Sequence, residues 1–255
     1  MDKVTLDRLA RALPDIPRWV ETRSMLLSGR CEIFGLEGRA EPCFVVRDSE
    51  EEPCFAVRDS EEHEERLVSV VGRPAEGAIR EAVTRNRNGG IVLAPPETES
   101  HVLTALPDWK TTRATLHLLG DAPQLPHVPA GAVRLIAPSE LSSIDGLPPD
   151  LLSELRVAAR RSPIAASLVG DRFVSFCYVA AQTEGLWDIS IDTLAEHRNR
   201  GHAARCVTYM IGYMQRRGKQ PVWGAEETNP PSLRLAAKLG FVPVDELIVF
   251  RPARN

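Results

Sequence analysis

The chain has 255 residues, of which 43% are hydrophobic and 26% charged, the balance of an ordinary globular protein with one large domain or two small ones. Lys and Arg number 31 against 35 Asp and Glu, so the formal net charge is −4. This balance disfavours a general nucleic-acid binder, because such binding depends on cations that neutralise phosphates.

The first half of the chain predicts a mixed α/β domain. Apolar residues at helical spacing, including Leu6, Leu9 and Leu13, predict an amphipathic helix at the N-terminus. Strand patterns follow at 32–36, 67–71, 91–93 and 114–118, and helical patterns at 75–84 and 100–106. No group of residues in this half has the spacing of a catalytic site.

A tandem repeat lies inside this half. The segment Glu41–Glu51 recurs with one change as Glu52–Glu62, and two short copies are too few for a repeat-protein fold. Each copy predicts a strand and an acidic turn, which favours a duplication tolerated in a surface hairpin. The alternative is a metal or redox pair of Cys43 and Cys54, although two Cys supply too few ligands for a metal.

A proline-rich segment at 120–129 predicts the boundary between two domains. It contains Pro123, Pro126 and Pro129, and proline fits neither helix interiors nor central strands. We therefore expect a smaller N-terminal mixed α/β domain at 1–125, with a role in packing or substrate selection, and a second domain at 126–255.

The second half alternates strand and helix patterns more clearly. Helical spacing predicts a helix at 151–160, and the strand patterns at 164–169 and 173–180 flank a turn that contains Gly170 and Asp171. A strand follows at 186–194, and then a tight turn and a long helix that ends near Gly218. Further strands at 221–225 and 244–251 flank a helix that begins at Asn229.

The turn Arg198-x-x-Gly201-x-Ala203 joins the strand at 186–194 to the long helix. Gly201 allows a left-handed backbone and a close approach by a ligand, and Ala203 leaves room over the first helical turn. The free N–H groups of the helix start, from Asn199 to Ala204, favour an anion, and Arg198, Arg200 and Arg205 add positive charge. A phosphate or pyrophosphate suits this turn, and an ordinary tight turn is the alternative.

A second motif, Asn229-x-x-Ser232 with Gly240-Phe241 at the end of its helix, follows in the order expected for one known superfamily. Together the two motifs resemble the GNAT superfamily of acetyl-CoA-dependent N-acyltransferases over residues 130–255. The sequences at 190–193, 221–223 and 235–241 are similar to those of the branch that includes antibiotic self-resistance acetyltransferases. The resemblance implies an α/β (α+β) fold, with a mixed sheet flanked by helices.

The resemblance also implies a coenzyme site for acetyl-CoA as cosubstrate, without a metal. The backbone of the strand end would bind the pantetheine arm and the acetyl carbonyl, the turn and helix start would hold the pyrophosphate, and the second motif would face the coenzyme. The residues implied are Asp192, Thr193, Leu194, Arg198, Asn199, Arg200, Gly201, His202, Ala203, Ala204, Asn229 and Ser232. The amine would attack the thioester directly.

Direct attack needs a base for the amine, and an acid for the leaving thiolate is an option. Strand alternation places Asp188, Ser190 and Asp192 on one face, and Asp188 is our candidate base. The alternative is that this face is solvated or that its carboxylates pair with Arg. Glu226 and Glu227 are the next candidates. Many members of the superfamily have a Tyr acid at the position that Ala236 occupies in this chain. Here either Tyr178 or Tyr213 supplies the proton, or the thiolate leaves without an acid. Tyr178, on its strand, is the better placed of the two.

Five Cys in no framework spacing favour a reduced, cytoplasmic setting, and the N-terminus lacks a secretory pattern. We expect an acetyltransferase of a small-molecule amine, without nucleic-acid or membrane partners, as a monomer or homodimer. The rival functions are a non-catalytic acyl-CoA-binding scaffold, which Ala236 favours, and acetylation of a protein Lys or N-terminus.

Overall fold

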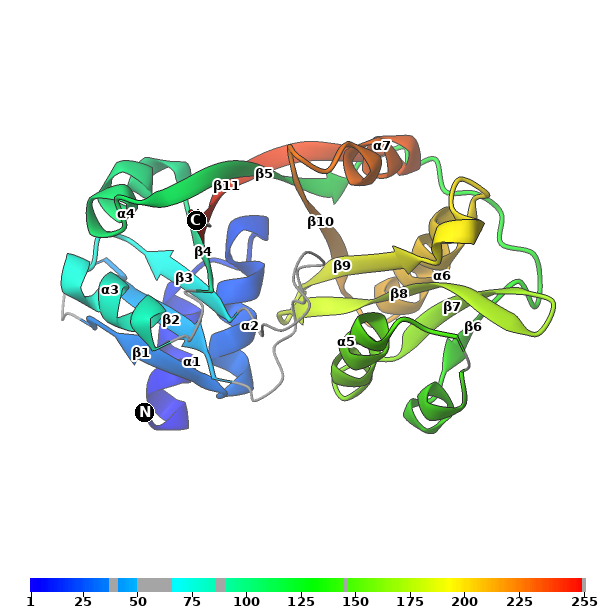
Figure 1. Ribbon diagram of the computed structural model, residues 1–255, viewed down its shortest axis with the longest axis horizontal. Coiled ribbons are helices and arrows are strands. Elements are labelled where there is room, and N and C mark those ends of the chain that lie inside the picture. Colours follow the sequence, from blue (N-terminus) through cyan, green and yellow to red (C-terminus); the bar gives the residue numbers. More distant parts are fainter. Residues whose placement is uncertain (37–40, 50–65, 86–89, 145, 254–255) are drawn as a thin grey trace. The chain divides into compact units, whose positions relative to one another are not determined.

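A computed structural model describes residues 1–36, 41–49, 66–85, 90–144 and 146–253 (Figure 1). The chain forms two compact units, and neither is one continuous segment. Unit 1 contains residues 1–116, 225–230 and 244–255, and unit 2 contains residues 117–224 and 231–243. No helix in these described ranges has the length and apolar character needed to cross a bilayer.

Unit 1 is a mixed sheet with helices on both faces. Its strands lie in the order β1-β2-β3-β4-β11-β5, where β3 runs parallel to β4 and β1 and β2 are antiparallel to their neighbours. The helices α1 and α2 pack on one face of the sheet, and α3 and α4 pack on the other. The elements are α1 (Lys3–Ala12), η1 (Pro17–Trp19), α2 (Val20–Ser28), β1 (Cys31–Phe34), β2 (Phe44–Asp48), β3 (Leu67–Val71), α3 (Glu76–Thr84), β4 (Ile91–Ala94), η2 (Pro96–Thr98), α4 (Glu99–Ala105), β5 (Trp109–Leu119) and β11 (Phe241–Pro252).

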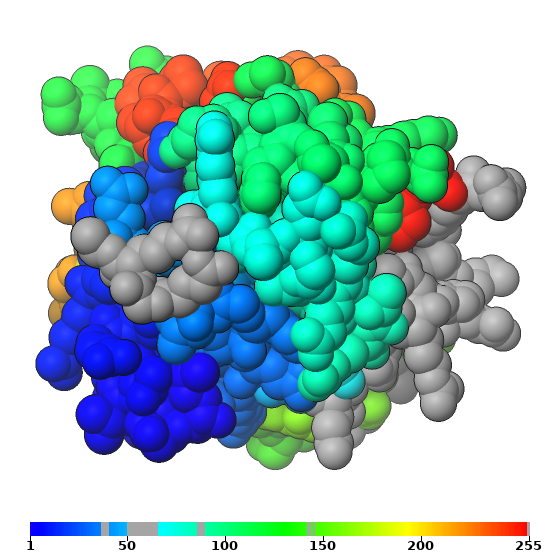
Figure 2. All heavy atoms as spheres, turned by 90° about the vertical axis from the view of Figure 1, so that its left-hand side faces the viewer, coloured from blue at the N-terminus to red at the C-terminus, as the bar shows by residue number. Residues whose placement is uncertain are grey.

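The apolar run Leu67–Val71 explains why β3 is central. All five of its residues are buried, which is the pattern of a strand covered on both faces. Val68 and Val70 pack with Ile79 of α3, whereas Leu67 packs with the core under α1 and α2. In Figure 2 the cyan and green residues of α3 and α4 cover the face of unit 1 that is turned to the viewer.

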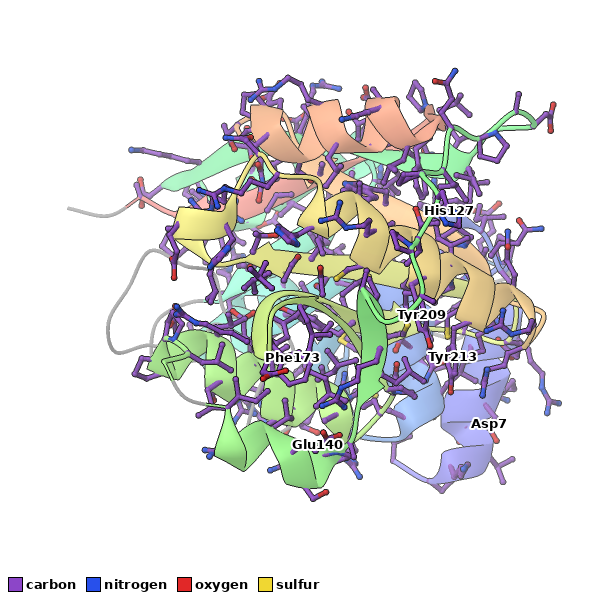
Figure 3. The ribbon with its side chains drawn as sticks, turned by 90° about the vertical axis from the view of Figure 1, so that its right-hand side faces the viewer. Asp7, His127, Glu140, Phe173, Tyr209 and Tyr213 are labelled. Carbon is purple, nitrogen blue, oxygen red and sulfur yellow. The ribbon has the colours of Figure 1, made fainter. Side chains whose placement is uncertain are left out.

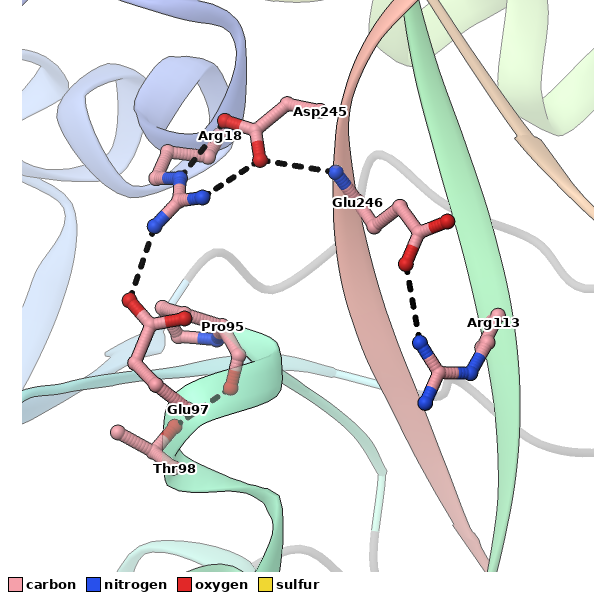
Figure 4. Close-up of polar contacts among 7 residues, drawn as sticks. All are labelled: Arg18, Pro95, Glu97, Thr98, Arg113, Asp245 and Glu246. Carbon is pink, nitrogen blue, oxygen red and sulfur yellow. Dashed lines mark hydrogen bonds and ion pairs between the residues drawn. The ribbon is translucent and has the colours of Figure 1, made fainter.

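Ion pairs fix β11 at the edge of this core. The Arg18 guanidinium of η1 holds both carboxylate oxygens of Asp245, at 2.6 and 2.7 Å, and reaches Glu97 at 2.9 Å (Figure 4). Arg113 of β5 donates to Glu246 at 2.9 Å. The bidentate geometry at Asp245 orients the strand as well as neutralising charge.

Unit 2 contains the strands that lie in the order β6-β7-β8-β9-β10 in the sheet. The first four strands are antiparallel to one another, and β10 is parallel to β9. The helix α5 packs on one face of the sheet, and α6 contacts β7, β8 and β9 through a separate set of buried residues. The elements are β6 (Val133–Ile136), η3 (Pro138–Ser143), α5 (Pro149–Ala159), β7 (Ile164–Val169), β8 (Arg172–Gln182), β9 (Leu186–Thr193), η4 (Ala195–His197), α6 (His202–Gln215), β10 (Gln220–Glu226) and α7 (Pro230–Leu239).

Most sequence-based elements match the structure within a few residues. The strands at 67–71 and 164–169 are confirmed with the same bounds, and the helix at 75–84 begins one residue later. No sequence pattern predicted α2 or β6, and the strands β5 and β11 are longer than the predicted ranges. The second copy of the repeat, with Cys54, lies outside the described residues, whereas the first copy contains β2.

Candidate active site

The strands β9 and β10 are paired over only part of their length in unit 2. In the described part of the chain they pair only at Gln220–Val222, which lie opposite Leu186–Asp188. The rest of β9, as far as Thr193, lies beyond this register and pairs with β8 on its other side. A strand edge that leaves its partner offers backbone groups to another extended chain.

A tight turn connects the end of β9 to α6. Asn199 and Gly201 both have left-handed backbones, with φ values of 60° and 80°. Asn tolerates this region better than other side chains, and Gly carries no penalty there. The turn delivers the chain to the start of α6, where His202, Ala203 and Ala204 form the first helical turn.

This turn has the features of an anion site. The first N–H groups of a helix have no partner within the helix, and the helix dipole adds partial positive charge at the same place. Arg198 donates through Nε to the Thr193 carbonyl at 3.2 Å, and the guanidinium of Arg205 lies beside Gly201. The predicted pyrophosphate residues are therefore contiguous, and the positive charge beside them fits a pyrophosphate.

The strand end 192–194 was predicted to bind the coenzyme through its backbone. Several of those groups already have partners. The Asp192 carbonyl accepts from Ser175 Oγ at 2.9 Å, and the Leu194 N–H donates to the Val174 carbonyl at 2.9 Å. The Thr193 hydroxyl lies 2.7 Å from Ser175 Oγ. The remaining groups of this segment stay candidates for the coenzyme.

Acidic groups gather on the α5 side of the sheet. Tyr178 of β8 lies opposite Ser190 of β9, so it shares a face with Asp192. The Tyr178 hydroxyl lies 2.8 Å from Asp192 Oδ2 and 2.6 Å from Glu154 Oε2 of α5. Asp188, on the same face of β9, is 6% exposed. The structure thus joins Tyr178 and Asp192 directly and adds Glu154, which the sequence analysis did not consider.

Glu226, Glu227 and Asn229 belong to unit 1, unlike the other predicted site residues. The Glu226 carboxylate accepts from Arg251 at 2.7 and 2.8 Å and from Thr112 at 2.6 Å. Burial raises the pKa of this carboxyl, and the hydrogen bonds from Arg251 and Thr112 outweigh it, so the pKa lies below its ordinary value. Such a carboxylate is a weak base, and its contacts favour a structural ion pair.

Ser232 accepts a hydrogen bond within unit 2. The Trp223 indole donates to Ser232 Oγ at 2.9 Å, and the ring of Trp223 meets Phe241 at 5.3 Å between centroids. Ala236, at the position for which the resemblance implies a Tyr acid, is fully buried. The coenzyme role of Ser232 stays a prediction.

Two other residues weighed from the sequence have different surroundings. Tyr213 lies late on α6, one turn after Tyr209 (Figure 3), and the Arg217 guanidinium lies 3.5 Å from its ring centroid. At 1.5 Å per residue, Tyr213 is roughly 16 Å along the helix from His202. Burial raises the pKa of Cys177, and the nearby Cys206 adds to that shift, which opposes a nucleophilic thiolate.

Residues 165–250 match the family described as GNAT acetyltransferase. This range contains β9, β10, the turn between β9 and α6, and Tyr178 with Asp192, whereas Glu154 precedes it. This stretch of the chain therefore resembles a GNAT acetyltransferase domain, as the sequence motifs predicted. The predicted α/β fold class is confirmed, because solved structures of GNAT proteins share the fold.

A curated relative and several solved structures resemble the chain. The "Uncharacterized N-acetyltransferase YdfB" of Bacillus subtilis (strain 168) is 33% identical over 85 residues, which span a third of this chain and a third of that protein. A GCN5-related N-acetyltransferase-like protein from Streptococcus suis 89/1591 has a TM-score of 0.66 at 16% identity, over 98% of this chain and 97% of that one. A GCN5-related N-acetyltransferase from Kribbella flavida has a TM-score of 0.61 at 14% identity, over 97% and 96%. These two solved structures show that the chain shares their fold.

Glu154 is the residue near Tyr178 that the sequence-based prediction missed. A signal for it existed, because Glu154 lies three residues after Leu151 and one before Leu155, and both leucines are buried. A carboxylate at the edge of an apolar stripe needs a polar partner, and Tyr178 provides it. In the described ranges, no group of three or more His, Cys, Asp or Glu residues could hold a metal ion.

Proposed function

We propose that this protein is an N-acetyltransferase that moves the acetyl group of acetyl-CoA to a primary amine of a small molecule. One observation carries the proposal. Within a GNAT acetyltransferase domain, β9 leaves β10 after three residue pairs and then runs into a left-handed, arginine-flanked turn at the start of a helix. An extended arm that ends in a pyrophosphate suits this combination.

The residues of the GNAT domain divide the task of holding acetyl-CoA. The N–H groups of Asn199–Ala204 would hold the pyrophosphate, and Arg198, Arg200 and Arg205 would neutralise its charge. The backbone of β9 from Asp192 onward would align the pantetheine arm. When bound, acetyl-CoA supplies a thioester whose acetyl carbon an amine can attack.

Proton transfer falls to the acidic face of β8 and β9. The attacking amine must be neutral, and a cationic amine loses its proton to a nearby carboxylate first. Asp188 and the cluster of Tyr178, Asp192 and Glu154 provide carboxylates and a phenol on this face. The net charge of −4 also favours the approach of a cationic amine.

Titration calorimetry with acetyl-CoA tests the coenzyme site. In the Gly201→Glu variant, a carboxylate stands at the turn, and we expect binding to be lost. The matched control is Gly218→Glu, because Gly218 also has a left-handed backbone, at φ 74°, and lies beyond the opposite end of α6. Both variants add one charge and similar backbone strain, so only the place of the charge differs.

Binding in the parent and in Gly218→Glu, but not in Gly201→Glu, supports the proposal. Release of free CoA thiol in the presence of a panel of small amines then tests the acceptor class. No binding of acetyl-CoA to the folded parent would sink the proposal. Turnover with lysine-containing peptides but with no small amine would favour a protein acetyltransferase instead.

A non-catalytic acyl-CoA-binding protein is the second candidate. Ala236 favours it, because this fully buried position carries no phenol to protonate a thiolate. Tight acetyl-CoA binding without thiol release for any amine would support this candidate. The two functions therefore share the coenzyme site and differ in turnover.

A further inference from the structure

His202 opens α6 and is only 7% exposed, although it directly follows the exposed turn. Its Nδ1 lies 2.9 Å from Ser167 Oγ of β7 and 3.1 Å from a guanidinium nitrogen of Arg205. An arginine can only donate, so Nδ1 must accept and carries no proton. His202 is therefore neutral in this arrangement, with its hydrogen on Nε2.

The guanidinium of Arg205 is folded back over the turn. Its NH1 lies 3.3 Å from the place where a Cβ on Gly201 would be, and its NH2 also approaches the Arg200 carbonyl at 3.5 Å. The contact with Nδ1 of His202 is the shortest of these. One cation is thus held where the N–H groups of the helix start converge.

The surroundings of His202 keep it able to accept. Burial lowers the pKa of His202, and Arg205, His197 and Arg200 lower it further in that order. These groups come from α6, from η4 and from the turn, while Ser167 of β7 carries no charge. The ring of His197 meets that of His202 edge-on at 6.0 Å between centroids.

We propose that His202 is a positioning residue, which holds the Arg205 guanidinium against the turn so that it contributes to binding the coenzyme pyrophosphate. The inference rests on the proposed acetyl-CoA site. His202 acts through Arg205 and touches no reacting atom, so its removal should change coenzyme affinity and KM for acetyl-CoA rather than kcat.

Calorimetry with CoA at pH 7.5 tests this role in four variants. His202→Leu keeps the bulk and removes the acceptor, whereas His202→Asn keeps an acceptor oxygen near the place of Nδ1. We expect His202→Leu and Arg205→Gln each to weaken binding about tenfold, the scale of one hydrogen bond to a charged group. The double variant should be no weaker than Arg205→Gln alone, and His202→Asn should stay close to the parent.

Thermal unfolding of each variant identifies those that remain folded, and only these are compared. Additive losses in the double variant would overturn the proposal, because His202 would then act without Arg205. Equal losses in His202→Asn and His202→Leu would overturn it too. If every variant binds CoA like the parent, the positioning role fails while the coenzyme site stands; if the parent binds no CoA, both fail.

The pH dependence of CoA binding gives a second readout. Below its lowered pKa, His202 is protonated on Nδ1 and no longer accepts from Arg205. Affinity of the parent should therefore fall relative to His202→Asn as the pH drops from 7.5 through the lowered pKa of His202, and titration of the CoA phosphate cancels in this comparison. A parent that gains affinity over His202→Asn at low pH would overturn the proposal, because the added charge would then matter more than the position of Arg205.

Discussion

Tyr178 and Asp192 lie on neighbouring strands, with the phenolic oxygen 2.8 Å from Oδ2 of the carboxyl group. Glu154 Oε2 approaches the same phenolic oxygen at 2.6 Å. A phenol has one hydrogen, so both contacts are well-aligned hydrogen bonds only when one of the carboxyl groups carries a proton and donates it. The cluster therefore brings one phenol and two carboxyl groups within hydrogen-bond distance at the α5 side of β8 and β9.

The variant Tyr178→Phe should slow acetyl transfer while leaving acetyl-CoA binding unchanged. It removes the oxygen that joins the two carboxyl groups, and a lost acid or base lowers kcat by roughly 10²–10⁴-fold. Steady-state kinetics with a small-molecule amine, together with calorimetry for the coenzyme, measure the two effects separately.

Tyr209→Phe is the control, because it removes a phenol from α6 and leaves the acidic cluster intact. We expect the control to retain the kcat of the parent. If Tyr178→Phe also retains it, the cluster is structural, and Asp188 becomes the remaining carboxylate candidate on this face.

Local sequence patterns predicted much of the fold, and the missed helix α2 shows where such patterns fail. The largely apolar runs at β3 and β7 predicted those strands with their true bounds, because an apolar run reports burial directly. The helix α2 was missed because its buried face includes Glu21, Thr22 and Arg23, so it has no apolar stripe. Buried polar residues are stabilised by tertiary contacts, such as the one between Thr22 and Ser69, that no local pattern contains.

The site divides in the same way. The turn at Arg198–Ala203 could be predicted because its chemistry is contiguous in sequence. The contact between Glu154 and Tyr178 joins residues 24 apart and depends on how α5 packs on β8. The compact unit 1 contains three separate segments of the chain, and no local sequence pattern indicates that these segments lie together.

The ion pair of Glu226 and Arg251 should contribute to stability. Glu226→Gln removes a charge that accepts from Arg251 and Thr112, and we expect a loss of about 1–2 kcal/mol in the free energy of unfolding at pH 7. The pKa of Glu226 is lowered in the folded chain, so this contribution is present above the unfolded pKa and disappears as the pH falls through the folded pKa. Denaturant unfolding at pH 7 and below pH 4 measures both.

Arg251→Gln and the double variant complete the cycle. If the pair is the source of the stability, the two single losses should exceed the loss in the double variant when summed. A kcat that falls more than about a hundredfold in Glu226→Gln, with unfolding unchanged, would instead support its role as the base.

Glu21 of α2 should make the stability of the protein depend on pH in the opposite sense. This carboxyl is 8% exposed, its Oε2 has no hydrogen-bond partner in the described part of the chain, and burial raises its pKa to about 7. Between the ordinary value of 4.5 and about 7, the folded chain keeps a proton that the unfolded chain has lost. Stability therefore falls as the pH rises through this window, by about 3 kcal/mol at most.

Glu21→Gln should remove this dependence, because the amide is neutral at every pH and similar in shape. We expect the variant to match the parent near pH 4.5 and to be more stable than the parent at pH 8, as measured by denaturant unfolding at both values. Glu81→Gln is the control, since Glu81 is an exposed glutamate of α3 whose side chain is 53% accessible. If the parent and Glu21→Gln lose stability in parallel between pH 4.5 and 8, the Glu21 carboxyl ionises as freely in the folded chain as in water, and its burial carries no cost.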